Sequence, residues 1–218
     1  MKILGLTGSI GMGKSTAAAM VRRLGWPVHD ADATVHRLMA ADGKAVPAIA
    51  AAFAGVVVEG RVNRNALGQR VFGDPAALRR LEAILHPLVR GEESAFLRAQ
   101  ARSRRKLVVL DIPLLFETGG DRRCDAVAVV SCAAFLQAQR VLARPGMNPA
   151  RLRAIRAQQM ADEQKRRRAD FVIFSGAGRA PALRRLRRAI ALLLAQSGSG
   201  AWPPRLSPKF SRPRQGHA

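Results

Sequence analysis

The chain consists of short, almost wholly apolar runs separated by longer stretches in which apolar residues recur at helical spacing. The short runs predict strands buried on both faces of a sheet, at residues 3–7, 28–30, 107–111, 125–131 and 170–174. The longer stretches predict helices, at residues 15–24, over much of 47–104 and at 181–196, with shorter helices ending near 38 and 144. Strands that alternate with helices indicate an α/β fold, in which helices cover both faces of a five-stranded parallel sheet.

The stretch from 47 to about 104 departs from this alternation, because its pattern is mostly helical. Pro75 is placed to start one helix, and His86-Pro87 is placed at the entrance to another, longer one. With 218 residues the chain is long enough for one domain with an insertion.

Residues 8–15 fit the pattern G-x-x-x-x-G-K-[ST] of a phosphate-binding loop, and Thr16 follows. Glycines allow the backbone N–H groups of such a loop to point at a phosphate. Lys14 supplies a positive charge to the β- and γ-phosphates, and the Ser15 hydroxyl is placed to bind Mg²⁺. The predicted strand before the loop and helix after it complete the order that the motif requires, so we expect nucleotide binding.

Carboxylates follow two of the predicted strands. Asp111 stands where a second aspartate characteristically supports Mg²⁺ in phosphate-loop enzymes, although a cap or turn residue fits there too. Asp30 and Asp32 end the strand after the loop helix, where a carboxylate can take the proton of an attacking hydroxyl. Capping of the next helix fits one of this pair equally well. If the strand stays extended, the two side chains face opposite ways, and the residue chemistry does not say which is catalytic.

Composition limits the partners and the compartment. The net charge is +22, but the excess is arginine on predicted helices, and no aromatic residues alternate with it as a base-stacking platform would require. We therefore expect no specific nucleic acid. Cys124 and Cys132 lie in an apolar pattern as buried thiols, and no stretch resembles a signal peptide or a membrane span. A cytoplasmic protein without a membrane partner is expected, with residues 197–218 as a disordered basic tail.

Several motifs together resemble dephospho-CoA kinase, over about residues 1–178. They are TGSIGMGKST at 7–16, DAD at 30–32, GRVNR at 60–64 with Leu67, Val71 and Phe72, LEAILHP at 81–87, DIPLLFE at 111–117, Gln139-Arg140 with Arg144, Gln159-Met160, and 165–170 before Phe171-Val172-Ile173. Many NTPases share the phosphate loop, whereas DIPLLFE and LEAILHP together point to this family specifically.

The resemblance implies a P-loop NTPase fold and transfer of the γ-phosphate of ATP to the ribose 3′-hydroxyl of dephospho-CoA, which is the final step of coenzyme A biosynthesis. It implies a kinase domain at 1–196, with a helical acceptor-binding insertion at about 40–104 and a lid at about 144–168. ATP and Mg²⁺ are the implied cofactors, and a monomer or small homo-oligomer is expected. A closing cationic lid suits phosphoryl transfer, which needs charge neutralisation and exclusion of water.

The family pattern also implies a role for individual residues. Asp32 inherits the role of base, Thr7 and Arg140 match residues at the reacting phosphates, and Arg144 is a second lid arginine. The full expected set is Asp32, Lys14, Arg140 and Thr7 for catalysis; Gly8, Gly11, Met12, Gly13, Lys14, Ser15, Thr16 and Arg144 for ATP; Asp32, His86 and Arg64 for the acceptor; and Ser15 and Asp111 for the metal. For His86, a plain helix-entry position is an equal alternative.

Phe174-Ser175 departs from the family pattern, which usually has Asp or Asn after the last strand. This departure bears on contacts with adenine and not on the chemistry. Two other classes of function are compatible with parts of the sequence. A nucleic-acid-stimulated ATPase is favoured by charge alone, and a nucleotide-binding regulatory module would bind ATP and transfer nothing.

Overall fold

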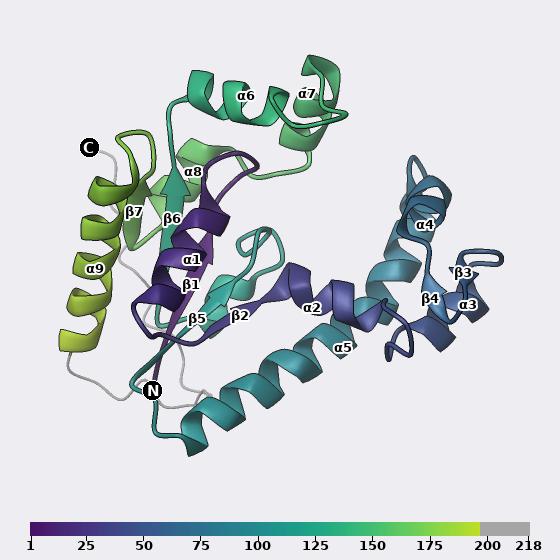
Figure 1. Ribbon diagram of the computed structural model, residues 1–218, viewed down its shortest axis with the longest axis horizontal. Helices are drawn as coiled ribbons and strands as arrows, with labels where there is room; N and C mark the ends of the chain where they lie inside the picture. Colours follow the sequence, from purple (N-terminus) through teal and green to yellow (C-terminus); the bar gives the residue numbers. More distant parts are fainter. Residues whose placement is uncertain (197–218) are drawn as a thin grey trace, which may run out of the picture.

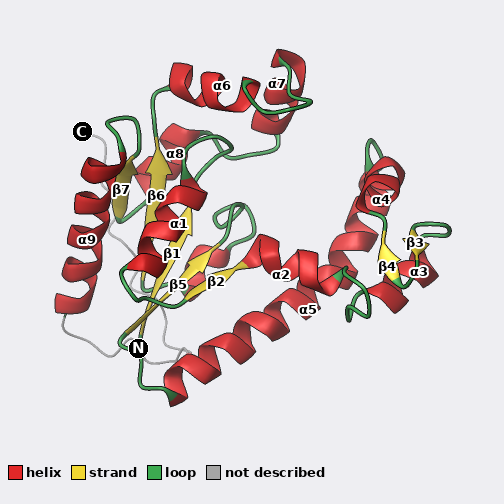
Figure 2. Cartoon of the chain, in the orientation of Figure 1, coloured by secondary structure: helices red, strands yellow, loops and turns green. Residues whose placement is uncertain are grey.

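A five-stranded parallel sheet lies at the centre of the protein, as the apolar runs predict (Figures 1 and 2). The computed structural model describes residues 1–196. The strands follow the order β2–β5–β1–β6–β7, and every neighbouring pair is parallel. They are β1 (Lys2–Thr7), β2 (Val28–Asp30), β5 (Leu107–Asp111), β6 (Ala126–Ser131) and β7 (Phe171–Phe174).

Helices cover both faces of this sheet, which confirms the predicted fold class. On one face, Leu4 and Leu6 of β1 pack in a core with α1 (Lys14–Arg23) and α9 (Arg179–Ala195). On the other face, Ile3 packs with Leu97 from the C-terminal half of α5 (Pro75–Arg102). Successive side chains of a strand point to opposite faces, so strands buried on both sides must be apolar throughout.

A second cluster of apolar residues lies apart from the sheet, to the right in Figure 1, and includes Ile49, Val62 and Leu67. It is built from α2 (Ala31–Leu38), α3 (Val46–Ala52), α4 (Arg64–Val71), the N-terminal part of α5, and a hairpin of β3 (Val57–Val58) and β4 (Arg61–Val62). The expectation of a mostly helical stretch did not include this hairpin, because each strand has only two residues and shows no periodicity. Its turn has positive φ at Glu59 and Gly60, as in a type I′ turn.

Helix α5 corrects the prediction that His86-Pro87 lies at the entrance to a helix. Asp74 caps the helix by accepting hydrogen bonds from Ala76 and Ala77, and Pro75 is its first residue, as expected. The helix then continues through Pro87 for 28 residues. Proline costs it one backbone hydrogen bond, but packing against the second cluster at one end and the sheet at the other holds both halves in place.

The remaining segments lie along the second half of the chain. Helices α6 (Ala134–Leu142) and α7 (Pro149–Ala157) follow the C-terminal end of β6, whereas the short 3₁₀ helix η1 (Gly120–Arg123) leads into β6 and α8 (Asp162–Arg168) leads into β7. Cys132 is buried as expected, whereas Cys124 is half-buried. Among the helices of residues 1–196, none is long and apolar enough to cross a membrane. The predicted tail at 197–218 lies outside the described residues.

Candidate active site

The phosphate loop joins β1 to α1, and its glycines are needed for the shape of the backbone. Gly11 and Gly13 have φ angles of +77° and +93°, which side chains rarely tolerate. A Cβ on Gly8 would lie 2.7 Å from the carbonyl oxygen of Val130, so the loop passes too close to β6 for any side chain there. Helix α1 begins immediately after the loop, at Lys14, which points its positive N-terminal end at the same space.

Two glutamines hold the tip of the loop from outside. The backbone N–H of Ile10 donates to Gln159 Oε1 at 3.1 Å, and Gln137 Nε2 donates to the Ile10 carbonyl at 2.8 Å. Gln137 belongs to α6, and Gln159 follows α7. The loop is therefore tied to the segment expected to form the lid.

A cavity of about 600 Å³ opens beside the loop. Its lining brings together most of the residues that the sequence assigned to ATP and to catalysis. They are Gly8, Gly11, Gly13, Lys14, Ser15, Thr16, Asp32, Arg140 and Arg144. Asp32 is the one carboxylate among the lining residues within 1–196.

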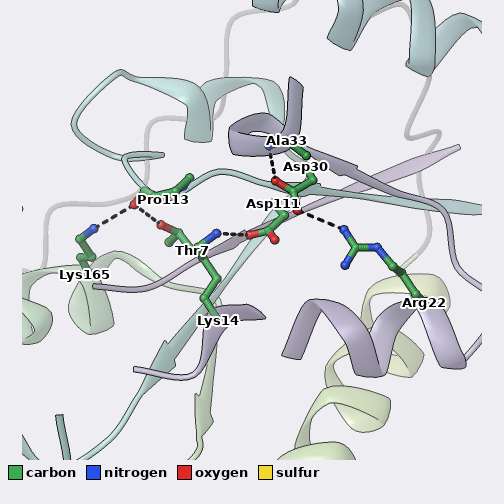
Figure 3. Close-up of polar contacts among 8 residues, drawn as sticks. All are labelled: Thr7, Lys14, Arg22, Asp30, Ala33, Asp111, Pro113 and Lys165. Carbon is green, nitrogen blue, oxygen red and sulfur yellow. Dashed lines mark hydrogen bonds and ion pairs between the residues drawn. The ribbon is translucent and has the colours of Figure 1, made fainter. Parts of the chain in front are cut away.

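Lys14 and Asp111 face each other at the floor of this site (Figure 3). Lys14 Nζ lies 2.7 Å from Asp111 Oδ1, and the Asp111 side chain is almost fully buried. Burial raises the pKa of Asp111; Lys14 opposes the shift, and the nearby charges of Asp30 and Asp32 add to it. Asp111 thus lies between the Lys14 ammonium and two further carboxylates.

The structure gives Asp30 and Asp32 different surroundings. Helix α2 begins at Ala31, so the strand does not stay extended through Asp32, and the condition for opposite-facing side chains is not met. Asp30 caps α2 by accepting the Ala33 N–H at 3.0 Å, and it also accepts from Arg22 at 3.3 Å (Figure 3). Burial would raise the pKa of Asp30, but these two bonds and Lys14 outweigh it and lower the pKa. Asp32 lies in the first turn of α2, exposed to the cavity.

The oxygen groups at this floor fit a magnesium ion. Mg²⁺ takes oxygen ligands and usually uses one or two protein side chains, with phosphates and water supplying the rest. The Ser15 hydroxyl lies in the lining, and the Asp111 carboxylate lies beside Lys14. A ready-made cage of three or more His, Cys, Asp or Glu side chains does not occur in residues 1–196.

Arg140 is positioned by the residue that departs from the expected family pattern. Its guanidinium donates to Ser175 Oγ at 2.9 Å and to the Ser175 carbonyl at 3.2 Å, and Ser175 Oγ donates to the carbonyl of Met12 at 2.7 Å. Ser175 thus connects the arginine to the phosphate loop. The Phe174 ring lies outside the cavity lining and is flanked by the guanidinium groups of Arg166 and Arg185.

Other expected site residues lie away from the cavity surface. The Met12 side chain is buried, and its sulfur accepts from the Cys132 N–H. Thr7 is fully buried and donates its hydroxyl to the Pro113 carbonyl at 2.8 Å. Arg64 and His86 belong to the second cluster of helices, outside the lining. His86 is exposed in the interior of α5, which removes its helix-entry alternative.

Sequence reasoning gave no role to several residues that contact the loop or the cavity. Arg179, the first residue of α9, lines the cavity, and Gln137 and Ser175 bind the phosphate loop or Arg140. Gln159 belongs to the Gln159-Met160 motif shared with the family, but the motif gives no sign of the hydrogen bond that Gln159 accepts from Ile10. Glutamine and serine are common residues without a sequence pattern of their own. Only the fold shows that these particular side chains bind the loop or Arg140.

Comparison with known proteins gives one consistent result. The family model described as dephospho-CoA kinase matches residues 2–179. A dephospho-CoA kinase of Paramagnetospirillum magneticum is 72% identical over 166 residues, which are 76% of this chain and 78% of that protein. One from Rhodospirillum rubrum is 61% identical over 202 residues, 92% of this chain and 94% of that protein.

Solved structures agree with the fold. A crystal structure of a Thermus thermophilus protein, 37% identical, superposes with a TM-score of 0.78 and covers 89% of this chain and 98% of its own. A dephospho-CoA kinase from Campylobacter jejuni is 22% identical, with a TM-score of 0.59 and coverage of 88% and 97%. At 22% identity, the similarity to the Campylobacter jejuni structure supports the fold alone.

Proposed function

The chain belongs to the dephospho-CoA kinase family, and from this premise we propose that Asp32 accepts the proton of the attacking hydroxyl in its cavity. The protein is an enzyme that uses ATP to phosphorylate the ribose 3′-hydroxyl of dephospho-CoA, giving coenzyme A and ADP. In this reaction the new bond joins the ribose oxygen to the γ-phosphorus. The bond from that phosphorus to the β-phosphate oxygen breaks, and the hydroxyl proton passes to the base.

One observation carries the assignment of the base. Asp32 is exposed in the cavity lining, whereas Asp30 is engaged as a helix cap and with Arg22, and Asp111 is engaged with Lys14. A general base must be free to reach the proton it takes. Of these three carboxylates, Asp32 meets that requirement.

We assign the phosphates of ATP to the loop and to the cations around it. The loop N–H groups and Lys14 would hold the β- and γ-phosphates, and Arg140 and Arg144 would neutralise charge that develops during transfer. The position of Arg140, fixed by Ser175, supports this role. Because Thr7 donates to Pro113 behind the cavity wall, its part in catalysis would be indirect.

For Mg²⁺ we propose the Ser15 hydroxyl and the Asp111 carboxylate as the residues that hold it. When bound, the ion neutralises charge on the β- and γ-phosphates. Asp111 is held in place at the end of β5, where its backbone pairs with both β1 and β2. The strands thus hold the proposed metal ligand at a fixed place relative to the loop.

The proposed acceptor side is the insertion at about 40–104, with Arg64 and His86 as its binding residues. Both are exposed there, and Arg64 Nη1 lies 2.7 Å from His36 Nε2 on α2, the helix that starts beside Asp32. The lid is proposed at about 144–168. We further propose a cytoplasmic monomer or small homo-oligomer with no specific nucleic acid and no membrane partner, on the basis of composition.

Two measurements test this function together. ADP release is compared with dephospho-CoA, adenosine, nucleoside monophosphates and no acceptor, and dephospho-CoA should give much the fastest turnover. Asp32→Asn, which keeps the size but cannot take the proton, should lower kcat by roughly 10²–10⁴-fold with little change in the KM for ATP. Asp30→Asn should be milder, since Asn caps helices about as well as Asp. An inactive Asp30→Asn beside a near-normal Asp32→Asn would reverse the assignment of the base.

A further inference from the structure

A lysine that the reaction does not use is completely buried near the site. Lys165 of α8 has no exposed side-chain surface, and its ammonium lies 2.9 Å from Glu117. Removing two charges from water is unfavourable, and apolar side chains of similar volume often fill such a place with equal or better stability. Stability alone therefore does not account for an ion pair at this position, so its directional contacts matter.

The first of these contacts leads to the cavity wall. Lys165 Nζ donates to the Pro113 carbonyl at 3.3 Å, and the Thr7 hydroxyl donates to the same oxygen at 2.8 Å (Figure 3). Pro113 lines the cavity, and it stands two residues after Asp111, the proposed metal ligand. A buried cation from α8 thus holds the backbone that immediately follows Asp111.

The second contact leads to the phosphate loop. Glu117 accepts the backbone N–H of Met160 at 2.8 Å, and the preceding residue, Gln159, accepts the N–H of Ile10 in the loop. Burial would raise the pKa of Glu117, but the bonds from Lys165 and Met160 outweigh it and lower the pKa. The carboxylate therefore stays ionised and joins the base of the proposed lid to the segment after β5.

We propose that Lys165 and Glu117 form a positioning pair for phosphoryl transfer, which fixes the Pro113 carbonyl and the end of β5 against the phosphate loop. Neither residue lines the cavity itself. Lys165 acts on the lining through the Pro113 carbonyl. Glu117 acts on the loop through Met160 and Gln159. The inference rests on the proposed function, since it assumes that transfer takes place in this cavity. A displacement of about 1 Å in such an arrangement can cost on the order of 10²-fold in rate.

The test removes both charges at once, so that no buried charge is left without a partner. In Lys165→Met/Glu117→Gln, the glutamine carbonyl can still accept the Met160 N–H. We expect a Tm within about 5 °C of the parent protein, because replacing a whole buried pair is often neutral. We expect kcat to fall by about 10–100-fold with the KM for ATP changed less than about threefold, because the loop itself is intact.

A second ion pair provides a matched control. Glu93 is buried in α5 and binds Arg123 of η1 through two bonds, at 2.9 and 3.2 Å, and neither residue lines the cavity. Glu93→Gln/Arg123→Met removes the same two charges and should leave kcat within about twofold, because it moves no group near the reacting atoms. Parental kcat in the Lys165/Glu117 double variant would overturn the proposal, as would an equal loss of kcat in both double variants.

A single substitution keeps the test decisive if the double variant does not fold. Glu117→Asp preserves the charge and withdraws the carboxylate by one methylene, and Glu93→Asp does the same in the control pair. We expect kcat to fall about tenfold in Glu117→Asp and to stay within about twofold in Glu93→Asp; parental kcat in Glu117→Asp would overturn the proposal. Failure of the proposed function would be seen separately, as a parent protein that does not phosphorylate dephospho-CoA.

Discussion

The sheet region and the second cluster differ in where their proposed functional residues lie. In the sheet region, Lys14, Arg140 and the loop tip are each bonded to another element beside the cavity. In the second cluster, Arg64 and His86 are exposed, with Arg64 in contact with His36 of α2, on helices whose apolar core is separate from the core at the sheet. The proposed donor side is therefore built from groups tied to one another around the sheet, whereas the proposed acceptor residues lie on helices with a separate apolar cluster.

Helix α2 connects these two regions. Its first turn carries Asp32 in the cavity, and its last residue, Leu38, is buried in the cluster of the insertion. Arg64 of the insertion also contacts α2, at His36. The proposed base thus stands on the element that links the proposed donor and acceptor sides.

Loss of a donor-side group should have the largest effect. Lys14→Ala should lower kcat by about 10²–10³-fold, because the lysine acts on phosphate charge. The fold should remain, since strands and apolar cores hold it, and circular dichroism with thermal melting checks this. Lys44→Ala, which removes an exposed lysine paired with Glu92, is the control and should stay near parental activity. Activity of Lys14→Ala within a few-fold of the parent would remove Lys14 from the mechanism.

Loss of a proposed acceptor-side group should have a smaller effect, and it should change the KM for dephospho-CoA instead of kcat. Arg64→Ala should raise the KM for dephospho-CoA about tenfold, the worth of one hydrogen bond to a charged group, with the KM for ATP unchanged. Arg61 of the hairpin, which pairs with Glu59, gives the control variant Arg61→Ala. Steady-state kinetics with each substrate varied in turn measures both constants. Equal shifts in the two KM values would contradict the division between donor and acceptor sides.

The smallest predicted effect concerns a buried histidine between β2 and the C-terminal half of α5. His29 of β2 is buried against Phe96 of α5, with Nε2 unpartnered within the described chain. Burial lowers the pKa of His29, against the opposing charges of Glu93 and Asp30. The unfolded chain takes up this proton near pH 6.5, whereas the folded protein resists it to lower pH. Stability that is present above pH 6.5 should therefore be lost as the pH falls below 6.5 toward the lowered pKa.

His29→Phe removes this proton-binding site and keeps a ring beside Phe96. Between pH 7.5 and 5 its Tm should fall less steeply than that of the parent protein. Thermal melts at half-unit pH steps measure the two slopes. Identical slopes would show that His29 contributes nothing to the pH dependence.

The sheet region could be predicted almost completely from the sequence, because its signals are local. Uninterrupted apolar runs identify buried parallel strands, and the spacing of Gly8, Gly13 and Lys14 identifies the loop. Nearly all the residues that the sequence assigned to ATP line one cavity in the structure. The identity of the acceptor came from the resemblance to the family. The same resemblance selected Asp32 over Asp30 as the base, a choice that the residue chemistry had left open.

What the sequence could not give depends on contacts between distant segments. Pro87 has the local pattern of a helix boundary, yet packing at both ends keeps α5 continuous. Ser175 holds Arg140 only because β7 ends beside the phosphate loop. Asp30 and Asp32 have the same chemistry, and the start of α2 at Ala31 makes one a cap and leaves the other exposed.

The unbroken helix α5 has a mechanical consequence. From Pro75 to Pro87 it forms an arm of about 18 Å, given a rise of about 1.5 Å per residue, and the arm begins within the insertion. Pro87 lacks one backbone bond, which makes it the point of least bending stiffness. A bend of about 10° there would move the far end by roughly 3 Å, about the length of a hydrogen bond. The straightness of α5 therefore contributes, together with α2, to where the proposed acceptor residues lie relative to the sheet.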